Sequence, residues 1–442
     1  MLNPFFNIIL VDFNYVRKGE FFMFDNRIRK HLSSFRVITI GFGGLIILGA
    51  LLLMLPVSSA SGCVTPFGDA LFTSTSAVCV TGLVVLDTGS YWSLFGQLVI
   101  ITLIQIGGLG VITVAVAFSL LSGKKVSLMQ RSFMQESVSA PVVGGVVRLT
   151  GFILKGTFII ELSGALLMMP VFCKDYGLKG IWFAIFHSIS AFCNAGFDVL
   201  GTADNQFASM TTYACNPVIN ITLMLLIVIG GIGFVTTAVL ITVPAIIFMI
   251  NDMMTGSERM PVFKALFQSV TLRTAGFNTV DLNAMKQASV MIMIILMLIG
   301  GSPGSTAGGM KTTTFAVLMG NMVATFKRNK NIHFFERRID NDTVKNAATI
   351  AMMYITLFVT GAFIINVTDG ISLGKCLFET ASAVGTVGLT LGITPQLGIL
   401  SRIVLIILMF MGRVGGLTLI YAAFSGNGNS YSKFPEEKIN IG

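Results

Sequence analysis

Long runs of apolar residues dominate this sequence of 442 residues and restrict how it can fold. Most of the runs have about 18 residues or more, enough for a helix to cross a hydrocarbon layer of roughly 30 Å. They lack the alternating pattern of a membrane barrel, so helices must do the crossing. The sequence therefore predicts an all-α polytopic membrane protein. The expected spans are 37–57, 94–121, 149–172, 217–250, 288–300 with a less regular continuation to 326, 347–367 and 400–424.

Composition agrees with a membrane protein, because 54% of the residues are hydrophobic and only 11% are charged. The net charge is +9, and the basic residues are concentrated in a few segments. Of the 29 Lys and Arg residues, 17 fall in 17–36, 124–131, 327–345 and the segment after 432. Cytoplasmic loops of membrane proteins carry such an excess. We therefore expect a multi-pass protein of the cell membrane with both termini in the cytoplasm. A basic patch for nucleic acid is a much weaker explanation.

The sequence offers no set of residues typical of catalysis or of a bound transition metal. Its three histidines and six cysteines show no metal-ligand spacing. Glu161 and Arg402 look like lone charges within spans, without a His, Cys or Asp neighbour arranged for catalysis. No small-residue cleavage site follows the first apolar stretch, so 1–36 is expected to be a cytoplasmic arm. We do not expect an enzyme.

One short pattern occurs four times between the spans. It reads VCVTG at 78–82 (the first motif), FCNAG at 192–196 (the second), LRTAG at 272–276 (the third) and VGTVG at 384–388 (the fourth). Each motif follows a short amphipathic segment of about three helical turns, too short to cross a bilayer. Each precedes an apolar run with a glycine-rich break. The first aligned glycines of these breaks are 107, 230, 300 and 412, which lie 25, 34, 24 and 24 residues after the motif glycines. This internal repetition predicts four units of span, re-entrant helix, motif and span.

Such motifs have a physical use at membrane depth, where non-helical backbone must line a water-filled path or be buried in protein. Four motifs around one axis would present a ring of carbonyl oxygens that replaces the water around a potassium ion. Glycine at the fifth position permits positive φ and keeps the axis clear. The alternative is that each glycine ends a helix in an ordinary turn, but four in register favour the ring. The candidate filter residues are Val78, Cys79, Val80, Thr81, Gly82, Phe192, Cys193, Asn194, Ala195, Gly196, Leu272, Arg273, Thr274, Ala275, Gly276, Val384, Gly385, Thr386, Val387 and Gly388.

These motifs, with SPGSTAGGMKTTTF at 302–315 and MGRVGGLT at 411–418, make the chain resemble the Trk/Ktr/HKT superfamily of potassium transporters. The resemblance runs from about residue 31 to the end and is greatest to KtrB, the membrane subunit of bacterial Ktr systems. It implies potassium uptake through a pseudo-four-fold pore, a homodimer, and a cytoplasmic ring of KtrA-like regulatory subunits. Because the chain has no P-loop or Rossmann fingerprint, ATP, ADP or NAD would bind the partner subunit. Dependence on sodium stays open.

The resemblance also implies a gate. Glycine and proline disfavour helix interiors, and the glycine-rich segment 300–310 corresponds to an intramembrane gating loop in the family. A simple helix kink is the alternative. Arg413 is costly in lipid and is expected beside this gate, facing the pore; its alternative role is to pair with a buried carboxylate or with helix-end carbonyls. The candidate gate residues are Gly300, Gly301, Ser302, Pro303, Gly304, Ser305, Thr306, Ala307, Gly308, Gly309 and Arg413.

The expected organisation follows from these units. It comprises a cytoplasmic arm (1–36), the first repeat (37–123), a linker with the second repeat up to its external loop (124–215), the rest of the second repeat with the third (216–326), a basic linker (327–346), and the fourth repeat with its tail (347–442). The uncharged run 217–250 departs from the family. Either a tight hairpin forms near Thr236–Thr237 or about twenty residues have been lost, and we favour the loss. An alternating-access cation carrier is the rival function.

Overall fold

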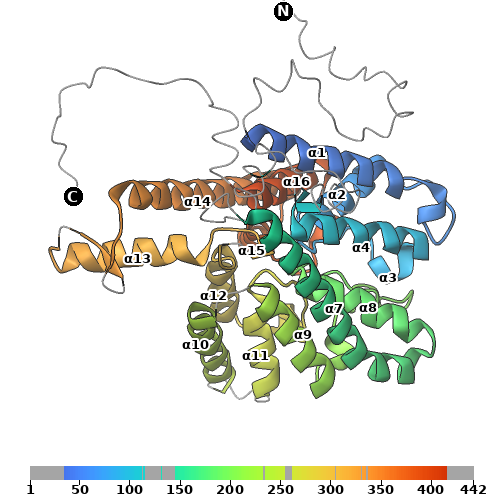
Figure 1. The fold of residues 1–442 in the computed structure, drawn as a ribbon. Coiled ribbons are helices and arrows are strands. Elements are labelled where there is room, and N and C mark those ends of the chain that lie inside the picture. The colour runs from blue at the N-terminus through green and yellow to red at the C-terminus, as the bar shows by residue number, and fades with distance from the viewer. Residues whose placement is uncertain are drawn as a thin grey trace, which may run out of the picture.

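The computed structural model of the protein describes residues 34–111, 113–114, 131, 145–231, 234–253, 261–303, 305–329, 331–334 and 337–415. In these residues the chain is predominantly helical, as the sequence predicts (Figure 1). The α-helices are α1 (Ser34–Leu53), α2 (Phe67–Val78), α3 (Thr88–Tyr91), α4 (Leu94–Leu109), α7 (Val146–Tyr176), α8 (Lys179–Phe192), α9 (Pro217–Gly230), α10 (Phe234–Met253), α11 (Val262–Thr271), α12 (Gln287–Leu298), α13 (Thr312–Phe326), α14 (Asn341–Asp369), α15 (Leu373–Gly385) and α16 (Ile399–Val414). Short 3-10 turns are η3 (Pro56–Ser58), η4 (Thr211–Tyr213), η5 (Leu282–Ala284) and η6 (Thr394–Gln396).

Three of the described helices are long and apolar enough to cross a membrane, namely α7, α14 and the segment Arg36–Leu53 of α1. The helices α4, α9, α12 and α13 are apolar but shorter. Large apolar side chains cover the outer faces of the long helices; Phe152, for example, is 75% exposed. A surface this apolar suits contact with lipid and not with water.

The four short helices α2, α8, α11 and α15 are enclosed by longer ones. Helix α2 packs against α1 and α4, α8 against α7 and α9, and α15 against α14 and α16. Helix α11 packs against α10 and α9. In Figure 1, α11 lies between α10 and α9, and α8 lies beside α7. Burial in protein allows a helix to end at membrane depth, because its free carbonyls do not face lipid.

The predicted span 94–121 is interrupted within its glycine-rich break. Helix α4 ends at Leu109, and Gly110 follows with φ of 87°. A positive φ is accessible to glycine at little cost and commonly ends a helix. Helix α16 ends in the same way at Gly415, with φ of 87°.

The structure corrects the expectation for the run 217–250. Helix α9 ends at Gly230, and Gly231 caps it; helix α10 begins at Phe234. Helix α10 continues through 236 and 237, so the tight hairpin near Thr236–Thr237, the less favoured of the two alternatives, is wrong. The interruption occurs at the glycines because they tolerate a break better than β-branched threonine does. The loss of residues relative to the family stays a prediction.

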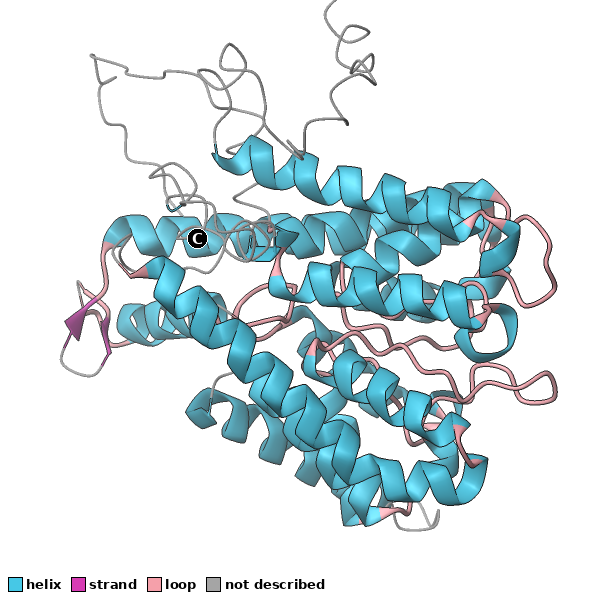
Figure 2. Ribbon diagram, turned by 45° about the vertical axis from the view of Figure 1, so that its right-hand side comes forward, coloured by secondary structure: helices cyan, strands magenta, loops and turns pink. Residues whose placement is uncertain are grey.

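The run from 288 to 326 is also divided. Helix α12 ends at Leu298 and α13 begins at Thr312, and the described residues between them are not helical. Beyond α13, part of the expected basic linker pairs β1 (His333–Phe334) antiparallel with β2 (Arg337–Arg338). Figure 2 shows these strands in magenta, at one end of the molecule. This hairpin is a small departure from the all-α prediction. Most of the predicted N-terminal arm, the segment 115–130 and the tail from 416 onward lie outside the described residues.

Candidate ion-conduction site

The four motifs have the same backbone conformation. Their glycines Gly82, Gly196, Gly276 and Gly388 have φ of 92°, 68°, 82° and 91°. The third residue of each motif is also left-handed, which is unusual for a residue with a side chain. These residues are Val80, Asn194, Thr274 and Thr386, with φ between 53° and 65°. Four segments far apart in the sequence therefore bend in the same way directly after a short helix.

The motif glycines meet in a closed ring. A Cβ atom placed on Gly82 would lie 2.4 Å from the carbonyl oxygen of Ala195 in the second motif. A Cβ placed on Gly196 would lie 2.7 Å from the oxygen of Ala275, and one placed on Gly276 would lie 2.6 Å from that of Val387. The fourth motif returns to the first, because a Cβ on Gly388 would lie 2.1 Å from the oxygen of Thr81. No side chain fits at these distances, so only glycine allows the four backbones to approach this closely.

Hydroxyl groups of the short helices hold the motifs in place. The hydroxyl of Ser76 accepts a hydrogen bond from the backbone N–H of Gly82 at 3.0 Å, and Ser382 does the same for Gly388 at 3.0 Å. In the second repeat Ser190 donates instead to the carbonyl of Phe197, at 2.8 Å. Because these hydroxyls are buried, each bond fixes the position of a backbone group that has no water to replace it.

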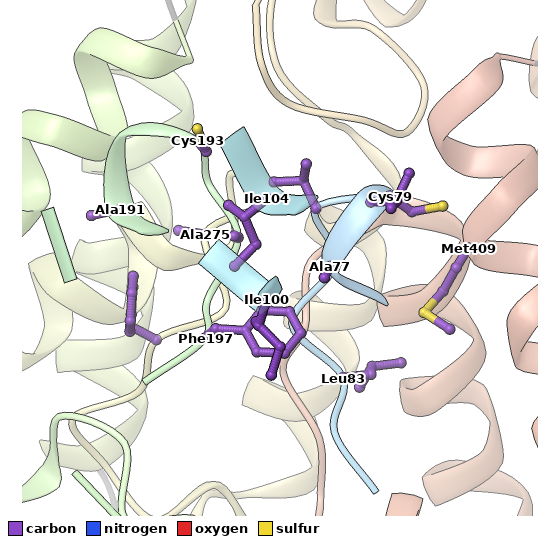
Figure 3. Close-up of a cluster of buried hydrophobic side chains, with 14 of the residues drawn as sticks. Ala77, Cys79, Leu83, Ile100, Ile104, Ala191, Cys193, Phe197, Ala275 and Met409 are labelled. Carbon is purple, nitrogen blue, oxygen red and sulfur yellow. The ribbon is translucent and has the colours of Figure 1, made fainter. Parts of the chain in front are cut away.

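A second set of hydroxyls joins three of the short helices to their preceding spans. Ser74 donates to the carbonyl of Ile46 at 2.7 Å, Ser188 to that of Glu161 at 2.6 Å, and Ser269 to that of Ile241 at 2.6 Å. Figure 3 shows the apolar side chains around the motifs, with Ile100 and Ile104 of α4 drawn between the first and second. The motif backbone is therefore supported from behind by packing and by hydrogen bonds.

Several buried polar atoms in the motifs make no hydrogen bond within the part of the chain that the structure describes. They are the hydroxyls of Thr81, Thr274 and Thr386 and the side-chain amide of Asn194. Each of these four residues has no exposed surface. Buried polar groups without a protein partner are uncommon and normally face water or an ion. Such groups suit a path for a cation.

A cavity of about 190 Å³ opens from the ring of glycines. Three carboxylates line it, those of Asp87, Asp198 and Asp281, and its described lining contains no basic side chain. Asp87 accepts from the backbone N–H of Ser90 and of Phe207, both at 2.8 Å. Burial, and next the carboxylate of Asp87, raise the pKa of half-buried Asp198 from 3.8 to about 7. The mouth of the ring therefore favours cations, by an amount that depends on pH.

On another side of the motifs lies the non-helical segment between α12 and α13, of which all but residue 304 is described. Its ends are held together, because the N–H of Gly300 donates to the carbonyl of Met310 at 2.7 Å. The hydroxyl of Thr306 donates to the carbonyls of Phe192, at 3.3 Å, and Gly230, at 3.2 Å. A Cβ on Gly308 would lie 2.2 Å from the hydroxyl of Thr386. This segment, called here the 300–310 loop, therefore contacts the second and fourth motifs.

The structure ties Arg413 to backbone carbonyls. Its guanidinium donates to Thr306 in the 300–310 loop and to Gly107 and Gly108 at the end of α4, the last at 3.0 Å. The contacts with Gly107 and Gly108 are the helix-end contacts that sequence reasoning offered as the alternative to a pore-facing charge. The contacts join the first, third and fourth repeats at one side chain.

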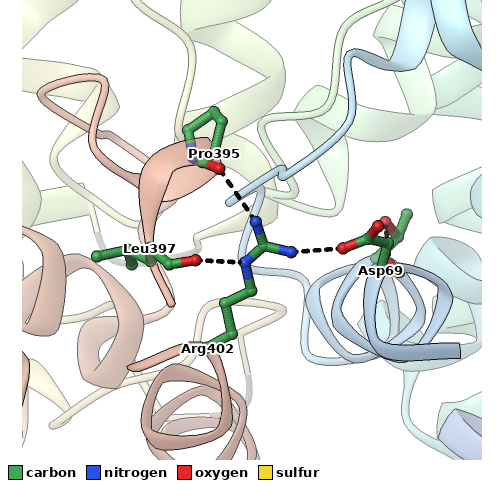
Figure 4. A network of polar contacts seen from close by, with 5 residues as sticks. Asp69, Pro395, Leu397 and Arg402 are labelled. Atoms are coloured by element: carbon green, nitrogen blue, oxygen red, sulfur yellow. Dashed lines mark hydrogen bonds and ion pairs between the residues drawn. The ribbon is translucent and has the colours of Figure 1, made fainter. Parts of the chain in front are cut away.

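Sequence reasoning missed two polar contacts. Arg402 is not a lone charge, because it forms an ion pair with Asp69 at 2.5 Å (Figure 4). Glu161 is not isolated either, because the amide of Gln105 donates to both its oxygens, at 3.0 and 3.2 Å. Each partner lies in another repeat, far away in the sequence. The one available signal was that Gln105 and Asp69 are themselves polar residues in or beside apolar segments.

The comparisons with known proteins agree with this arrangement. The family model described as TrkH, a cation transport protein, matches residues 35–243 and 235–431. The potassium/sodium uptake protein NtpJ of Enterococcus hirae is 38% identical, over 94% of this chain and 99% of that protein. The Ktr system potassium uptake protein B of Bacillus subtilis is 35% identical, over 92% of this chain and 96% of its own length.

A solved structure has the same fold. The crystal structure of the potassium transporter TrkH from Vibrio parahaemolyticus superposes with a TM-score of 0.72 at 19% identity, covering 90% of this chain and 86% of that one. At this identity the likeness concerns the fold alone. The family model and the close relatives go further, and they confirm the resemblance inferred from the motifs: this chain is a member of the TrkH family of cation transport proteins, in its potassium-uptake (Ktr/Trk) branch.

Proposed function

We propose that this protein carries potassium ions across the cell membrane through the ring formed by the four motifs. The observation that carries the proposal is the closed contact of Gly82, Gly196, Gly276 and Gly388, each beside a carbonyl oxygen of the next motif. Carbonyl oxygens arranged in a ring replace the hydration shell of a potassium ion. The relatives named for potassium uptake support the choice of ion.

Two features of the surroundings favour a cation on this path. The short helices end at the motifs, and the C-terminal end of a helix carries a partial negative charge. The carboxylates of Asp87, Asp198 and Asp281 at the mouth raise the local concentration of cations before they enter the ring.

We further propose that the 300–310 loop and Arg413 form the gate. The loop contacts the carbonyls of Phe192 and Gly230 through Thr306, so it occupies space beside the motifs that a permeating ion needs. Its described bonds are to backbone groups and to the side-chain nitrogens of Arg413 and Lys311, and they can be exchanged without unfolding a helix. A change in the cytoplasmic part of the protein could release these bonds.

We infer the partners from the relatives. One is named as component B of a Ktr system, which suggests that this chain works with other subunits. We propose a homodimer with a cytoplasmic KtrA-like ring that binds ATP, ADP or NAD, and with both termini of this chain on the cytoplasmic side. The two basic residues of β2, Arg337 and Arg338, are exposed and suit that side. Sodium dependence is a further proposal, because the NtpJ relative is named for potassium and sodium.

The test is potassium-dependent growth and rubidium uptake in cells that lack their own potassium uptake, with and without a regulatory subunit. The proposal requires growth at low potassium, and rubidium uptake that potassium inhibits more strongly than sodium does. A membrane-inserted protein that supports neither contradicts it. Uptake that saturates at a few ions per second and reverses with an imposed sodium gradient would instead favour the alternating-access carrier.

A further inference from the structure

Arg402 joins the beginning of α16 to two other parts of the molecule (Figure 4). Its Nε donates to the carbonyl of Leu397 at 2.9 Å, and its Nη2 to that of Pro395 at 3.0 Å. Both carbonyls belong to the segment that leads from the fourth motif to α16. Its Nη1 forms the 2.5 Å ion pair with Asp69, in the first turn of α2. The side chains of Arg402 and Asp69 are 24% and 20% exposed, so the pair is largely shielded from water.

This ion pair lies at the junction of the ring between the fourth motif and the first. The first, second, third and fourth motifs follow one another along the chain, but the fourth and the first lie near the two ends of the described residues. The backbones are close together at that junction, because a Cβ placed on Gly388 would lie 2.1 Å from the oxygen of Thr81. Helices α2 and α16 pack against each other there. Their spacing depends on non-covalent contacts, because no nearby chain connection limits it.

The same position is polar in two other repeats. Arg402 lies ten residues before the aligned glycine 412, and its counterparts before 107 and 230 are Gln97 and Asn220. Gln97 donates to the carbonyl of Trp92 at 3.2 Å and accepts from the indole N–H of Trp182 in α8 at 2.7 Å. It therefore holds its own outer segment and the short helix of the next repeat, as Arg402 does.

In the part of the chain that the structure describes, the counterparts of Arg402 in the second and third repeats do not connect their repeat to the next short helix. Asn220 donates to the carbonyls of Asn216, at 2.7 Å, and Ala214, at 3.2 Å, which hold only its own outer segment. In the third repeat the position is Val290, which has no polar group. Among the four positions, Arg402 alone uses an ion pair to reach the next short helix.

We propose that the Asp69–Arg402 pair is a positioning contact that sets the spacing of the first and fourth motifs, and with it the preference for potassium over sodium. The inference rests on the proposed function. Asp69 lies in the first turn of the 12-residue helix α2, and the first motif begins at the last residue of that helix. A shift of Asp69 therefore moves the Thr81 carbonyl with it. The number and arrangement of carbonyls around the ion decide selectivity. Loss of the pair would relax the ring at the junction that lacks a chain connection.

The experiment compares Asp69→Asn, Arg402→Gln and the double variant with the wild type in cells that lack their own potassium uptake. It measures rubidium uptake per folded protein and its inhibition by potassium and by sodium. We expect the potassium-over-sodium preference to fall about two- to fivefold in each single variant, the range for a partly exposed ion pair. The double variant should fall no further than the singles, because both changes remove one contact. Arg402→Lys keeps a positive charge opposite Asp69 and should retain a preference nearer to the wild type.

Asp342→Asn is the matched control. It removes the ion pair of Asp342 and Lys345 on α14, which has a 3.5 Å separation and side chains 81% and 78% exposed. Its selectivity should equal that of the wild type. An unchanged preference in both Asp69→Asn and Arg402→Gln overturns the inference, and so does a lower yield of folded protein with the preference intact. Failure of the proposed function looks different, because then the wild type itself takes up no rubidium.

Discussion

The guanidinium of Arg413, near the end of α16, donates a hydrogen bond to the carbonyl of Thr306 in the 300–310 loop. The same side chain donates to Gly107 and Gly108 at the end of α4. A charge that is bound to three carbonyl dipoles is partly compensated, yet it remains a positive charge close to the motifs. Arg413 can therefore both hold the loop and oppose the passage of a cation.

Arg413→Gln is expected to speed rubidium uptake by about tenfold. An uncompensated charge ~6 Å from a cation would cost about 3 kcal/mol, or roughly a hundredfold in rate, at an effective dielectric near 20. The carbonyl contacts reduce that effect, and glutamine keeps some of their hydrogen bonds. Uptake should be measured per folded protein without the regulatory subunit. Arg148→Gln, which removes an exposed charge from α7, is the control. Unchanged uptake with poor assembly would show that the arginine only supports structure.

Shortening the loop by deletion within 302–309 is expected to raise uptake in the absence of the regulatory subunit. The deletion removes the contacts of Thr306 with Phe192 and Gly230, and that of the Gly309 N–H with the carbonyl of Gly412 at 3.1 Å. Thr306→Val is a milder test, because it removes only the hydroxyl. Both variants leave the motif glycines intact, so selectivity should be kept. Lower uptake from a protein that still inserts normally would mean that the loop is structural.

Gly82→Ser is expected to weaken the preference for potassium over sodium. The new Cβ would meet the carbonyl oxygen of Ala195 at 2.4 Å, and φ of 92° disfavours a side chain as well. One position of the ring must then move. Gly374→Ala in α15 is the control, because a Cβ there meets nothing within 4 Å. The ratio of potassium to sodium uptake measures the effect, and equal ratios in Gly82→Ser and the wild type would contradict the assignment of the ring.

Uptake at low potassium is expected to fall as the external pH falls through about 7. Burial raises the pKa of Asp198 to about 7, so its carboxylate is charged above that pH and becomes protonated below it. Asp87 and Asp281 are the other titratable residues that line this cavity. Loss of one charge ~6 Å from the ion through water changes the local free energy by about 0.7 kcal/mol, or roughly threefold in ion occupancy.

Asp198→Asn provides the control for this pH dependence. Asparagine is neutral at every pH, so the variant should show the low-pH rate throughout and should lose the step near pH 7. The measurement is initial rubidium uptake at pH 5.5, 7 and 8.5. A step that persists in Asp198→Asn would assign it to another group.

Local chemistry accounts for what the sequence determines by itself. Apolar runs of membrane-crossing length predict helices wherever they occur, because lipid leaves backbone groups no other partner. The motif glycines predict a left-handed bend, and Gly82 with φ of 92° is one example. Glycine and proline between 300 and 310 predict that the run ends, and α12 ends at Leu298. The repetition of these signals made the family recognisable.

The tertiary structure alone decided which distant groups meet. The pair of Asp69 and Arg402 joins residues at opposite ends of the described chain, and no spacing rule relates them. Glu161 and Gln105 meet because α4 and α7 belong to neighbouring repeats. Hydropathy and turn preferences depend on residues that are close together in the sequence. An ion pair depends instead on packing that brings two charged side chains together, however far apart they are in the sequence.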